Sequence, residues 1–353
     1  MGFVNFLDGV GFVASSQGLK RPQRGVACIA QSGTIVGNMV MSDRSLPVSH
    51  MLSMGNQTVL DLADGIDAVT DDPRVDVIML YVEGLKDARA FAEAVHRAHC
   101  ADLPIVCLKG GASEAGREIA LSHTGSLAGT PALYDAFFER LGIISVATFP
   151  ELLEMSKLLA LGDLPAGNRL MVETCSGTDS GYCADLAERH GVVLPQPEPA
   201  VQEKLRQVLP PIATPMNPLD VTMAQWADRD AQAKSLITLL EQPADAAALV
   251  INFPSHHENP TYEPAAQAMI DVRRVTNLPS YVISNLPEGL PLRIRDMLLS
   301  NGVVPLQGIE DAFSTLGRAA HYAQRREQLG SVGGPECRLV GTGELIAPRM
   351  LDE

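Results

Sequence analysis

The fold of this chain is decided by the stretch Gly25-Val-Ala-Cys-Ile-Ala-Gln-Ser-Gly-Thr34. Its first six residues form a short, continuous apolar run, which predicts a buried β-strand. The next four residues predict a tight turn and the start of a helix that continues to about Arg44. A wholly apolar strand followed at once by a helix is typical of a parallel sheet covered by helices on both faces.

The same alternation of strand and helix continues toward the C-terminus. The predicted strands are Val48–Met54, Asp76–Val82, Pro104–Leu108 and Ile143–Val146. The predicted helices are Val59–Thr70, Lys86–His99, Ala132–Leu141 and Pro150–Leu161. This regular order indicates βα units and a parallel sheet.

A linker-like stretch, Leu164-Pro-Ala-Gly-Asn168, comes next, and the pattern then restarts with a strand at Arg169–Thr174 and a helix at Ser180–His190. Later predicted elements are the strands Ala246–Phe253, Ser280–Ser284 and Val303–Pro305 and the helices Pro264–Thr276, Leu290–Ser300 and Gly308–Gln328. We predict an α/β protein of two tandem flavodoxin-like domains, 25–163 and 168–328, each with a doubly wound parallel sheet. Residues 1–24 and 329–353 lack an apolar period and are expected to be connectors.

Composition excludes several classes of partner. Acidic residues outnumber basic ones by 42 to 27, so the net charge of −15 opposes attraction to a nucleic acid. The apolar runs are shorter than the ~20 residues of a membrane span, and the N-terminus lacks the basic start of a secretory signal. We expect a cytoplasmic protein with no membrane partner. No C-x-x-C pair occurs, and no metal site is expected.

A candidate catalytic histidine lies in Leu121-Ser-His-Thr-Gly-Ser-Leu-Ala-Gly129. Six of the nine residues in 122–130 are Gly, Ser or Thr, which favour turns over regular structure and predict a loop. Near neutral pH an uncharged imidazole such as that of His123 is a competent nucleophile. The alternative is an ordinary loop histidine that faces solvent.

Two turns and one carboxylate are expected at the carboxyl ends of the strands, where parallel sheets bind ligands. Ser32-Gly33 and Ser176-Gly177 each follow a strand and open a helix, whose free N–H groups and dipole suit a phosphate. Each turn can also be no more than a helix cap. Glu83 ends the strand Asp76–Val82 and could accept the Nδ1–H of His123, or it could be a solvated strand-end residue.

Taken together, the motifs of this chain resemble those of the nucleoside-diphosphate-forming acyl-CoA synthetases, a superfamily that includes succinyl-CoA synthetase and the ADP-forming acetyl-CoA synthetases. The resemblance runs over most of the chain. The motifs that carry it are Ala30-Gln-Ser-Gly-Thr34, Ser53-Met-Gly-Asn56, Leu80-Tyr-Val-Glu-Gly84, Leu108-Lys-Gly-Gly-Ala-Ser-Glu-Ala-Gly116, Ser122-His-Thr-Gly-Ser-Leu-Ala-Gly129 and Asn217-Pro-Leu-Asp-Val221.

The resemblance implies roles for the candidate residues. His123 would be phosphorylated during turnover and Glu83 would steady it. The phosphate-binding residues would be Ser32, Gly33, Thr124, Gly125, Ser176 and Gly177. The family's second phosphate-binding turn is usually Asn-Ala-Gly-Gly, whereas this chain has Thr174-Cys-Ser-Gly177, a departure that leaves the affinity of this half-site open.

The resemblance also implies a reaction, in which acyl-CoA, ADP and phosphate give a carboxylic acid, CoA and ATP reversibly through phosphohistidine. The substrates would be CoA, ATP or ADP, phosphate and a small carboxylic acid or its acyl-CoA, with no tightly bound cofactor. Two further domains would be supplied by a longer polypeptide or by other subunits. One is a CoA-binding domain, and Gly2-Phe-Val-Asn5 resembles the last strand of that domain. The other is an ATP-grasp domain, which would bind Mg²⁺ with the nucleotide.

Two other functions stay open. The chain could be a noncatalytic regulatory or interaction module that retains the fold, or, on fold analogy alone, a flavin or nucleotide binder. The sequence leaves open the acyl group, the choice between ADP and GDP, whether the chain is a fragment or a natural subunit, and whether it forms a homo-oligomer.

Overall fold

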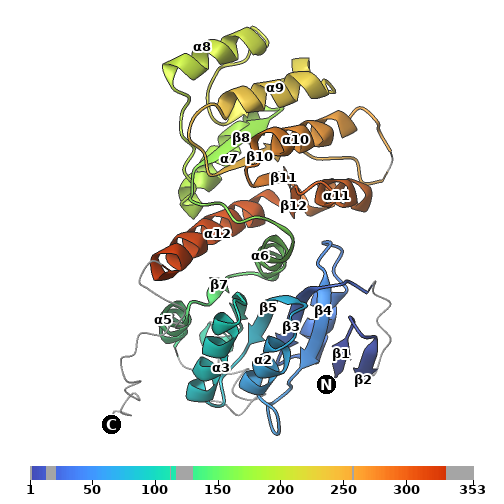
Figure 1. Cartoon of the computed structure of the whole chain (residues 1–353), viewed down its shortest axis with the longest axis vertical. Coiled ribbons are helices and arrows are strands. Elements are labelled where there is room, and N and C mark those ends of the chain that lie inside the picture. The colour runs from blue at the N-terminus through green and yellow to red at the C-terminus, as the bar shows by residue number, and fades with distance from the viewer. Residues whose placement is uncertain (1, 13–20, 112, 117–129, 257, 331–353) are drawn as a thin grey trace.

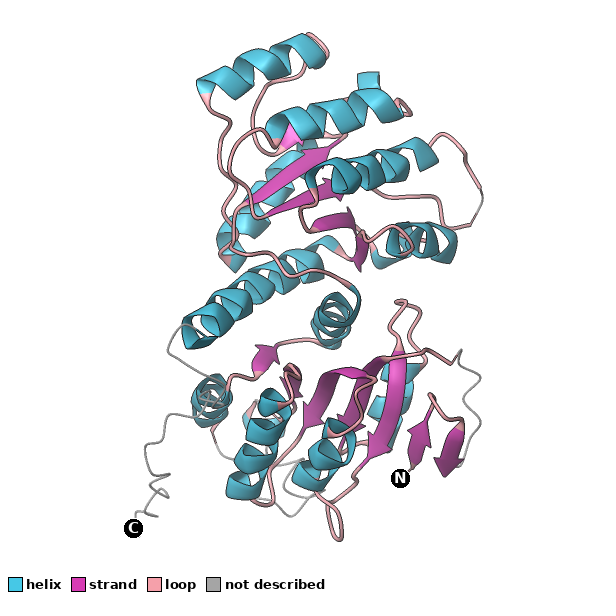
Figure 2. Ribbon diagram, in the orientation of Figure 1, coloured by secondary structure: helices cyan, strands magenta, loops and turns pink. Residues whose placement is uncertain are grey.

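Two β-sheets organise the chain, one built from residues before 147 and the other from residues after 169 (Figure 1). They are seen in a computed structural model that describes residues 2–12, 21–111, 113–116, 130–256 and 258–330. Strands and helices alternate along most of the chain, as the sequence predicts (Figure 2).

The first sheet has the strand order β2-β1-β4-β3-β5-β6-β7. Its parallel strands are β3 (Gly25–Ala30), β4 (Val48–Ser53), β5 (Val75–Val82), β6 (Ile105–Lys109) and β7 (Ile144–Val146). Counted along the chain, these five strands follow the order 2-1-3-4-5, which is the flavodoxin-like arrangement.

Two short strands lie within residues 1–24, the segment expected to be a connector. β1 (Phe3–Asn5) pairs antiparallel with β4, and β2 (Val10–Phe12) pairs antiparallel with β1. The two strands contain only three residues each, too few to show an alternating pattern. Val4 and Phe6 are nevertheless buried, because the sheet edge at β4 offers them an apolar surface.

The second sheet repeats this arrangement in the order β12-β11-β10-β8-β9. Its strands, all parallel, are β8 (Leu170–Thr174), β9 (Leu219–Asp220), β10 (Ala246–Val250), β11 (Ser280–Ser284) and β12 (Val304–Gln307). The strand β9 was not predicted because it has two residues and follows a proline-rich stretch. The predicted fold class, two flavodoxin-like α/β units in tandem, is confirmed.

Helices cover both faces of each sheet. The first unit has α1 (Gly33–Val40), α2 (Leu62–Thr70), α3 (Ala88–Cys100), α5 (Pro131–Leu141) and α6 (Phe149–Leu161). The second has α7 (Gly177–His190), α8 (Pro199–Val208), α9 (Arg229–Leu239), α10 (Glu263–Thr276), α11 (Leu292–Leu299) and α12 (Ile309–Gly330). Local sequence fixes several starts: Asp61 forms a capping box before α2, and Asp87 and Thr148 cap α3 and α6.

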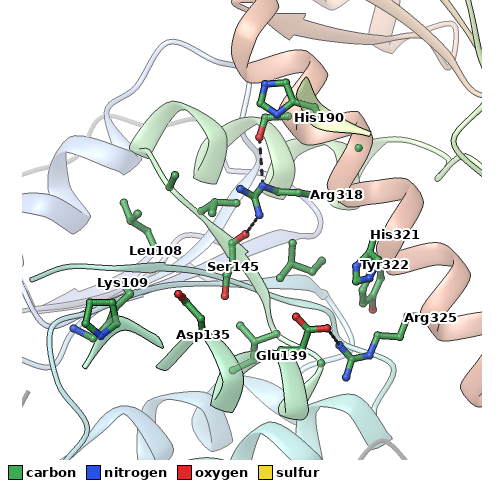
Figure 3. Close-up of a pocket in the computed structure, with 18 of the residues that line it drawn as sticks. Leu108, Lys109, Asp135, Glu139, Ser145, His190, Arg318, His321, Tyr322 and Arg325 are labelled. Carbon is green, nitrogen blue, oxygen red and sulfur yellow. Dashed lines mark hydrogen bonds and ion pairs between the residues drawn. The ribbon is translucent and has the colours of Figure 1, made fainter. Parts of the chain in front are cut away.

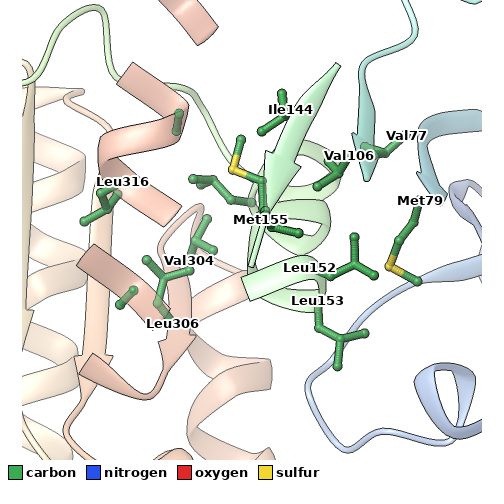
Figure 4. Packing of buried hydrophobic residues seen from close by; sticks show 14 of the residues in the cluster. Val77, Met79, Val106, Ile144, Leu152, Leu153, Met155, Val304, Leu306 and Leu316 are labelled. Carbon is green, nitrogen blue, oxygen red and sulfur yellow. The ribbon is translucent and has the colours of Figure 1, made fainter. Parts of the chain in front are cut away.

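The helix α6 joins the two units. Its residues Leu152 and Met155 belong to one buried cluster with Met79 of the first sheet and Leu306 of the second (Figure 4). Burying apolar surface contributes roughly 25 cal/mol per Å², so a helix shared by two sheets strongly favours their association. The predicted domain boundaries, 25–163 and 168–328, stay a prediction, and residues 331–353 of the expected C-terminal connector lie outside the described residues.

Buried charges accompany this apolar contact. The Glu154 carboxylate of α6 is fully buried and lies 2.9 Å from Nη1 of Arg44 and 2.7 Å from Nζ of Lys157. It also accepts a hydrogen bond from the backbone N–H of Gln307 in the second unit, at 3.0 Å. Burial lowers the pKa of Lys157, while Glu154 opposes that shift. The group therefore depends on one anion to compensate two cations.

We expect Glu154→Gln to lower the free energy of unfolding by about 3–5 kcal/mol, because it leaves buried cations without their partner. The loss should shrink as the pH rises, since Lys157 can then release its proton. Urea unfolding at several pH values measures this. Glu93→Gln is the control, since Glu93 forms an exposed pair with Arg89 and should cost about 0.5 kcal/mol or less. Equal losses in the two variants would contradict the prediction.

Candidate functional site

The first predicted turn lies at the carboxyl end of β3. Ser32 is the N-cap of α1, and its Oγ accepts a hydrogen bond from the N–H of Ile35 at 3.3 Å. Gly33 opens the helix and is exposed. The first turn of α1 contains no acidic residue, so no side chain of that turn offsets the positive end of the helix dipole. This turn is well suited to hold an oxyanion.

Gln31 connects this turn with the end of β5. Its Oε1 accepts hydrogen bonds from the backbone N–H groups of Glu83 and of Gly84, the latter at 3.0 Å. From the other side, Nε2 of Gln57 donates to the carbonyl oxygen of Gly84 at 3.1 Å. Both glutamines are buried, at 4% and 2% exposure. Two side-chain amides thus fix the backbone that follows β5.

Lys109 and Tyr134 complete the support of this backbone. Nζ of Lys109 donates to the carbonyl oxygen of Glu83 at 2.8 Å and also to that of Gly110. It lies 4.5 Å from the centre of the Tyr134 ring, whose hydroxyl accepts a hydrogen bond from the N–H of Leu85 at 3.3 Å. Burial lowers the pKa of Lys109, although Glu83 favours its charged form.

The Glu83 carboxylate, unlike the backbone of the same residue, is not held by a side chain of the described residues. Among the described residues, none forms a hydrogen bond or ion pair with it, and the residue is half-buried. The structure thus brings Ser32, Gly33 and Glu83 to one edge of the first sheet, with Gln31 between them. The other predicted residues of this half, His123, Thr124 and Gly125, lie outside the described residues, so their roles stay predictions.

The second predicted turn is less favourable to an anion. Ser176 is the N-cap of α7, without a side-chain cap hydrogen bond, and Gly177 opens the helix. A Cβ added at Gly177 would lie 3.4 Å from Oδ2 of Asp220. A second carboxylate, Asp179, lies in the first turn of α7, where it accepts a hydrogen bond from Asn285 at 2.8 Å. No hydrogen bond or ion pair between described residues joins this turn to Ser32-Gly33.

A buried carboxyl group beneath the second turn was missed by sequence reasoning. Glu173 of β8 is 2% exposed, and no residue within the described ranges forms a hydrogen bond with its Oε2. Burial raises the pKa of Glu173 well above its usual value of 4.5. The signal in the sequence was one acidic residue directly after three apolar ones in the strand Leu170–Thr174.

A cavity of about 730 Å³ lies between the two units (Figure 3). Lys109, Asp135 and Glu139 line it from the first unit, and Arg318 and Arg325 line it from α12. Several of its charges are already paired: Arg325 bonds Glu139 at 3.3 Å, and Arg318 bonds the carbonyl oxygen of Ser145 (Figure 3). Sequence reasoning did not find this cavity, because its walls come from segments far apart in the chain.

Comparisons with known proteins agree with the motifs. Residues 23–159 match the model of the succinyl-CoA ligase like flavodoxin domain. The alpha subunit of ADP-forming acetate-CoA ligase II from Pyrococcus furiosus is 30% identical over 311 residues, which are 88% of this chain and 66% of that protein. This chain belongs to the nucleoside-diphosphate-forming acyl-CoA synthetase family.

Further family members support this assignment. The ADP-forming acetate-CoA ligase of Methanocaldococcus jannaschii is 34% identical over 202 residues, 57% of this chain and 28% of that protein. The structure of Ca. Korarchaeum cryptofilum dinucleotide-forming acetyl-coenzyme A synthetase 1 with phosphate and ADP has a TM-score of 0.72 and 26% identity. It covers 88% of this chain and 67% of that one. The chain thus spans about two thirds or less of these relatives.

The described part of this acyl-CoA synthetase family member lacks two kinds of feature. No described helix is long and apolar enough to cross a membrane. No group of three or more His, Cys, Asp or Glu side chains within the described ranges could hold a metal ion.

We expect Glu173→Gln to become increasingly more stable than the wild type as the pH rises from about 5 to about 9. A carboxyl whose pKa is raised by folding stabilises the folded state fully below its unfolded-state pKa, and this contribution is lost as the pH rises through the folded-state pKa. The glutamine does not titrate. Thermal melting across this range measures the difference, with exposed Glu203→Gln as the control. A difference that does not change with pH would contradict the prediction.

Proposed function

We propose that this chain is the phosphohistidine-relay segment of an ADP-forming acyl-CoA synthetase. The observation that carries the proposal is the Glu83 turn, whose backbone is held by four side chains while its carboxylate has no partner among the described residues. Holding a carboxylate in place without pairing it is typical of a group that stabilises charge during a reaction. The adjacent Ser32-Gly33 turn supplies N–H groups for the phosphoryl oxygens.

In the proposed step, Nε2 of His123 attacks the phosphorus atom of an acyl phosphate. The new N–P bond forms as the P–O bond to the acyl group breaks, and the carboxylate leaves. Glu83 accepts the Nδ1–H of His123 and stabilises the positive charge that develops on the imidazole. The phosphoryl group then passes from His123 to ADP, which gives ATP and restores the free histidine. Each step is reversible.

The complete reaction would need further parts. Acyl-CoA and phosphate would form the acyl phosphate and release CoA in a CoA-binding domain or subunit. An ATP-grasp domain or subunit would bind the nucleotide with Mg²⁺. The name of the Pyrococcus furiosus relative, an alpha subunit, supports separate subunits, and the phosphate and ADP in the Ca. Korarchaeum cryptofilum structure support these two substrates.

We expect radiolabelled acetyl phosphate to phosphorylate His123 of the chain alone, because this donor needs neither CoA nor nucleotide. The label should be stable in alkali, lost in acid and absent from His123→Ala. Glu83→Gln should lower the labelling rate by about tenfold or more, because it removes the charge that stabilises the imidazolium but keeps the size of the side chain. Label on another residue, or an undiminished label in His123→Ala, would refute the relay. A wild-type rate in Glu83→Gln would refute the role of the carboxylate.

We also expect phosphate to bind mainly at the first turn. Gly33→Val should abolish the heat of phosphate binding in a calorimetric titration, because the side chain fills the exposed approach to the N–H groups. Gly177→Val should change it little, because Asp220 already opposes an anion there. The added Cβ at position 177 meets only an ordinary contact, which makes this variant a matched control. Equal losses in both variants would show that the two turns bind phosphate together.

A further inference from the structure

Gln31 occupies an unusual position in the proposed site. It lies directly before the N-cap Ser32, yet its side chain bonds the turn after β5, which is more than fifty residues away in sequence. One residue therefore links the oxyanion-binding turn to the turn that carries Glu83. It is 4% exposed, so solvent cannot replace its hydrogen bonds.

The two hydrogen bonds settle the orientation of the Gln31 amide. Two N–H donors, from Glu83 and Gly84, face the same side-chain atom, and only the carbonyl oxygen of an amide can accept both. The Nε2 group must then point away from them. It is buried and has no hydrogen-bond partner among the residues that the structure describes, which costs about 1–3 kcal/mol for such a donor. A methionine of similar length would avoid this cost but would leave the N–H groups of Glu83 and Gly84 without their acceptor, so the carbonyl oxygen is the part of the amide that this position uses.

We infer that Gln31 is a positioning residue that sets the Glu83 carboxylate relative to the Ser32-Gly33 turn. Accepting the N–H of Glu83 fixes the direction in which its Cα–Cβ bond leaves the backbone. Lys109 holds the carbonyl oxygen of the same residue, so both polar groups of the Glu83 backbone are held by side chains from neighbouring strand ends. The inference rests on the proposed function, because it assigns Gln31 a purpose in the reaction of Glu83.

The test is a double-mutant cycle of Gln31→Met and Glu83→Gln, with the rate of His123 labelling by acetyl phosphate as the readout. Gln31→Met should slow labelling about tenfold, because two hydrogen bonds to the turn are lost. In the Glu83→Gln background, the same change should slow it by less than about twofold, since there is no longer a charge to position. A tenfold loss in both backgrounds would overturn the inference.

The matched control is Gln225→Met. Gln225 is likewise buried, and its amide donates to the carbonyl oxygen of Val208 at 2.9 Å and accepts from Ser235 at 3.0 Å, all within the second unit. This variant should lose stability as Gln31→Met does, yet keep the wild-type labelling rate. Equal slowing in the two variants would show that Gln31 acts only through general stability. Gln31→Asn, which keeps an amide but withdraws it from Glu83, replaces Gln31→Met if that variant does not fold.

Hydrogen exchange gives a readout that does not depend on catalysis. The amides of Glu83 and Gly84 should exchange about tenfold faster in Gln31→Met than in the wild type, and those of β10 should not change. Unchanged exchange at Glu83 would overturn the inference directly. Faster exchange with an unchanged labelling rate would overturn it while leaving the proposed function intact. A wild-type protein that takes no label on His123 would instead refute the proposed function and, with it, the inference.

Discussion

The packing of α6 against both sheets is the constraint on which the rest of the structure depends. A carboxylate buried in that helix, Glu154, bonds Arg44 of the first unit and the backbone of Gln307 in the second. Buried ionic groups tolerate few alternative arrangements, because each misplaced partner leaves a charge without compensation. Apolar contacts thus hold the units together, while Glu154 favours one register between them. Both turns proposed for phosphate occupy sheets whose relative placement depends on this contact.

In the Glu83 turn, too, buried polar side chains favour one arrangement of the chain. Four side chains form hydrogen bonds with the backbone of this turn but not with the carboxylate of Glu83: Gln31, Gln57, Lys109 and Tyr134. Lys109 is instructive, because it bonds the backbone of Glu83 but forms no ion pair with the carboxylate of that residue. Its Nζ is instead committed to two carbonyl oxygens and lies over an aromatic ring. The Lys109 ammonium group therefore holds the turn and attracts the Glu83 carboxylate without forming an ion pair with it.

Local sequence predicted most strands to within a residue or two, because buried parallel strands are continuous apolar runs. Gly25–Ala30 and Ser280–Ser284 match the predicted bounds at both ends. The strands β2 and β9 were missed because segments of two or three residues are too short to show a periodic pattern, and pairing with a neighbouring strand decides their structure. Of the site, sequence could place Ser32 and Glu83 on one edge. The roles of Gln31 and Lys109 depend on contacts with distant backbone, which no local pattern encodes.

The two units have the same fold but differ in how well their helix N-termini suit an anion. Each has the same strand order, and each places a Ser-Gly pair after its first parallel strand. At Ser32-Gly33 the first helical turn has no acidic residue, whereas Ser176-Gly177 has Asp220 beside it and Asp179 in the helix. A helix N-terminus carries only about half a positive charge, so a carboxylate within its own first turn, such as Asp179, offsets much of its attraction for an anion. Topology therefore fixes where the two helix ends lie, but the charges around each end determine which can hold a phosphate.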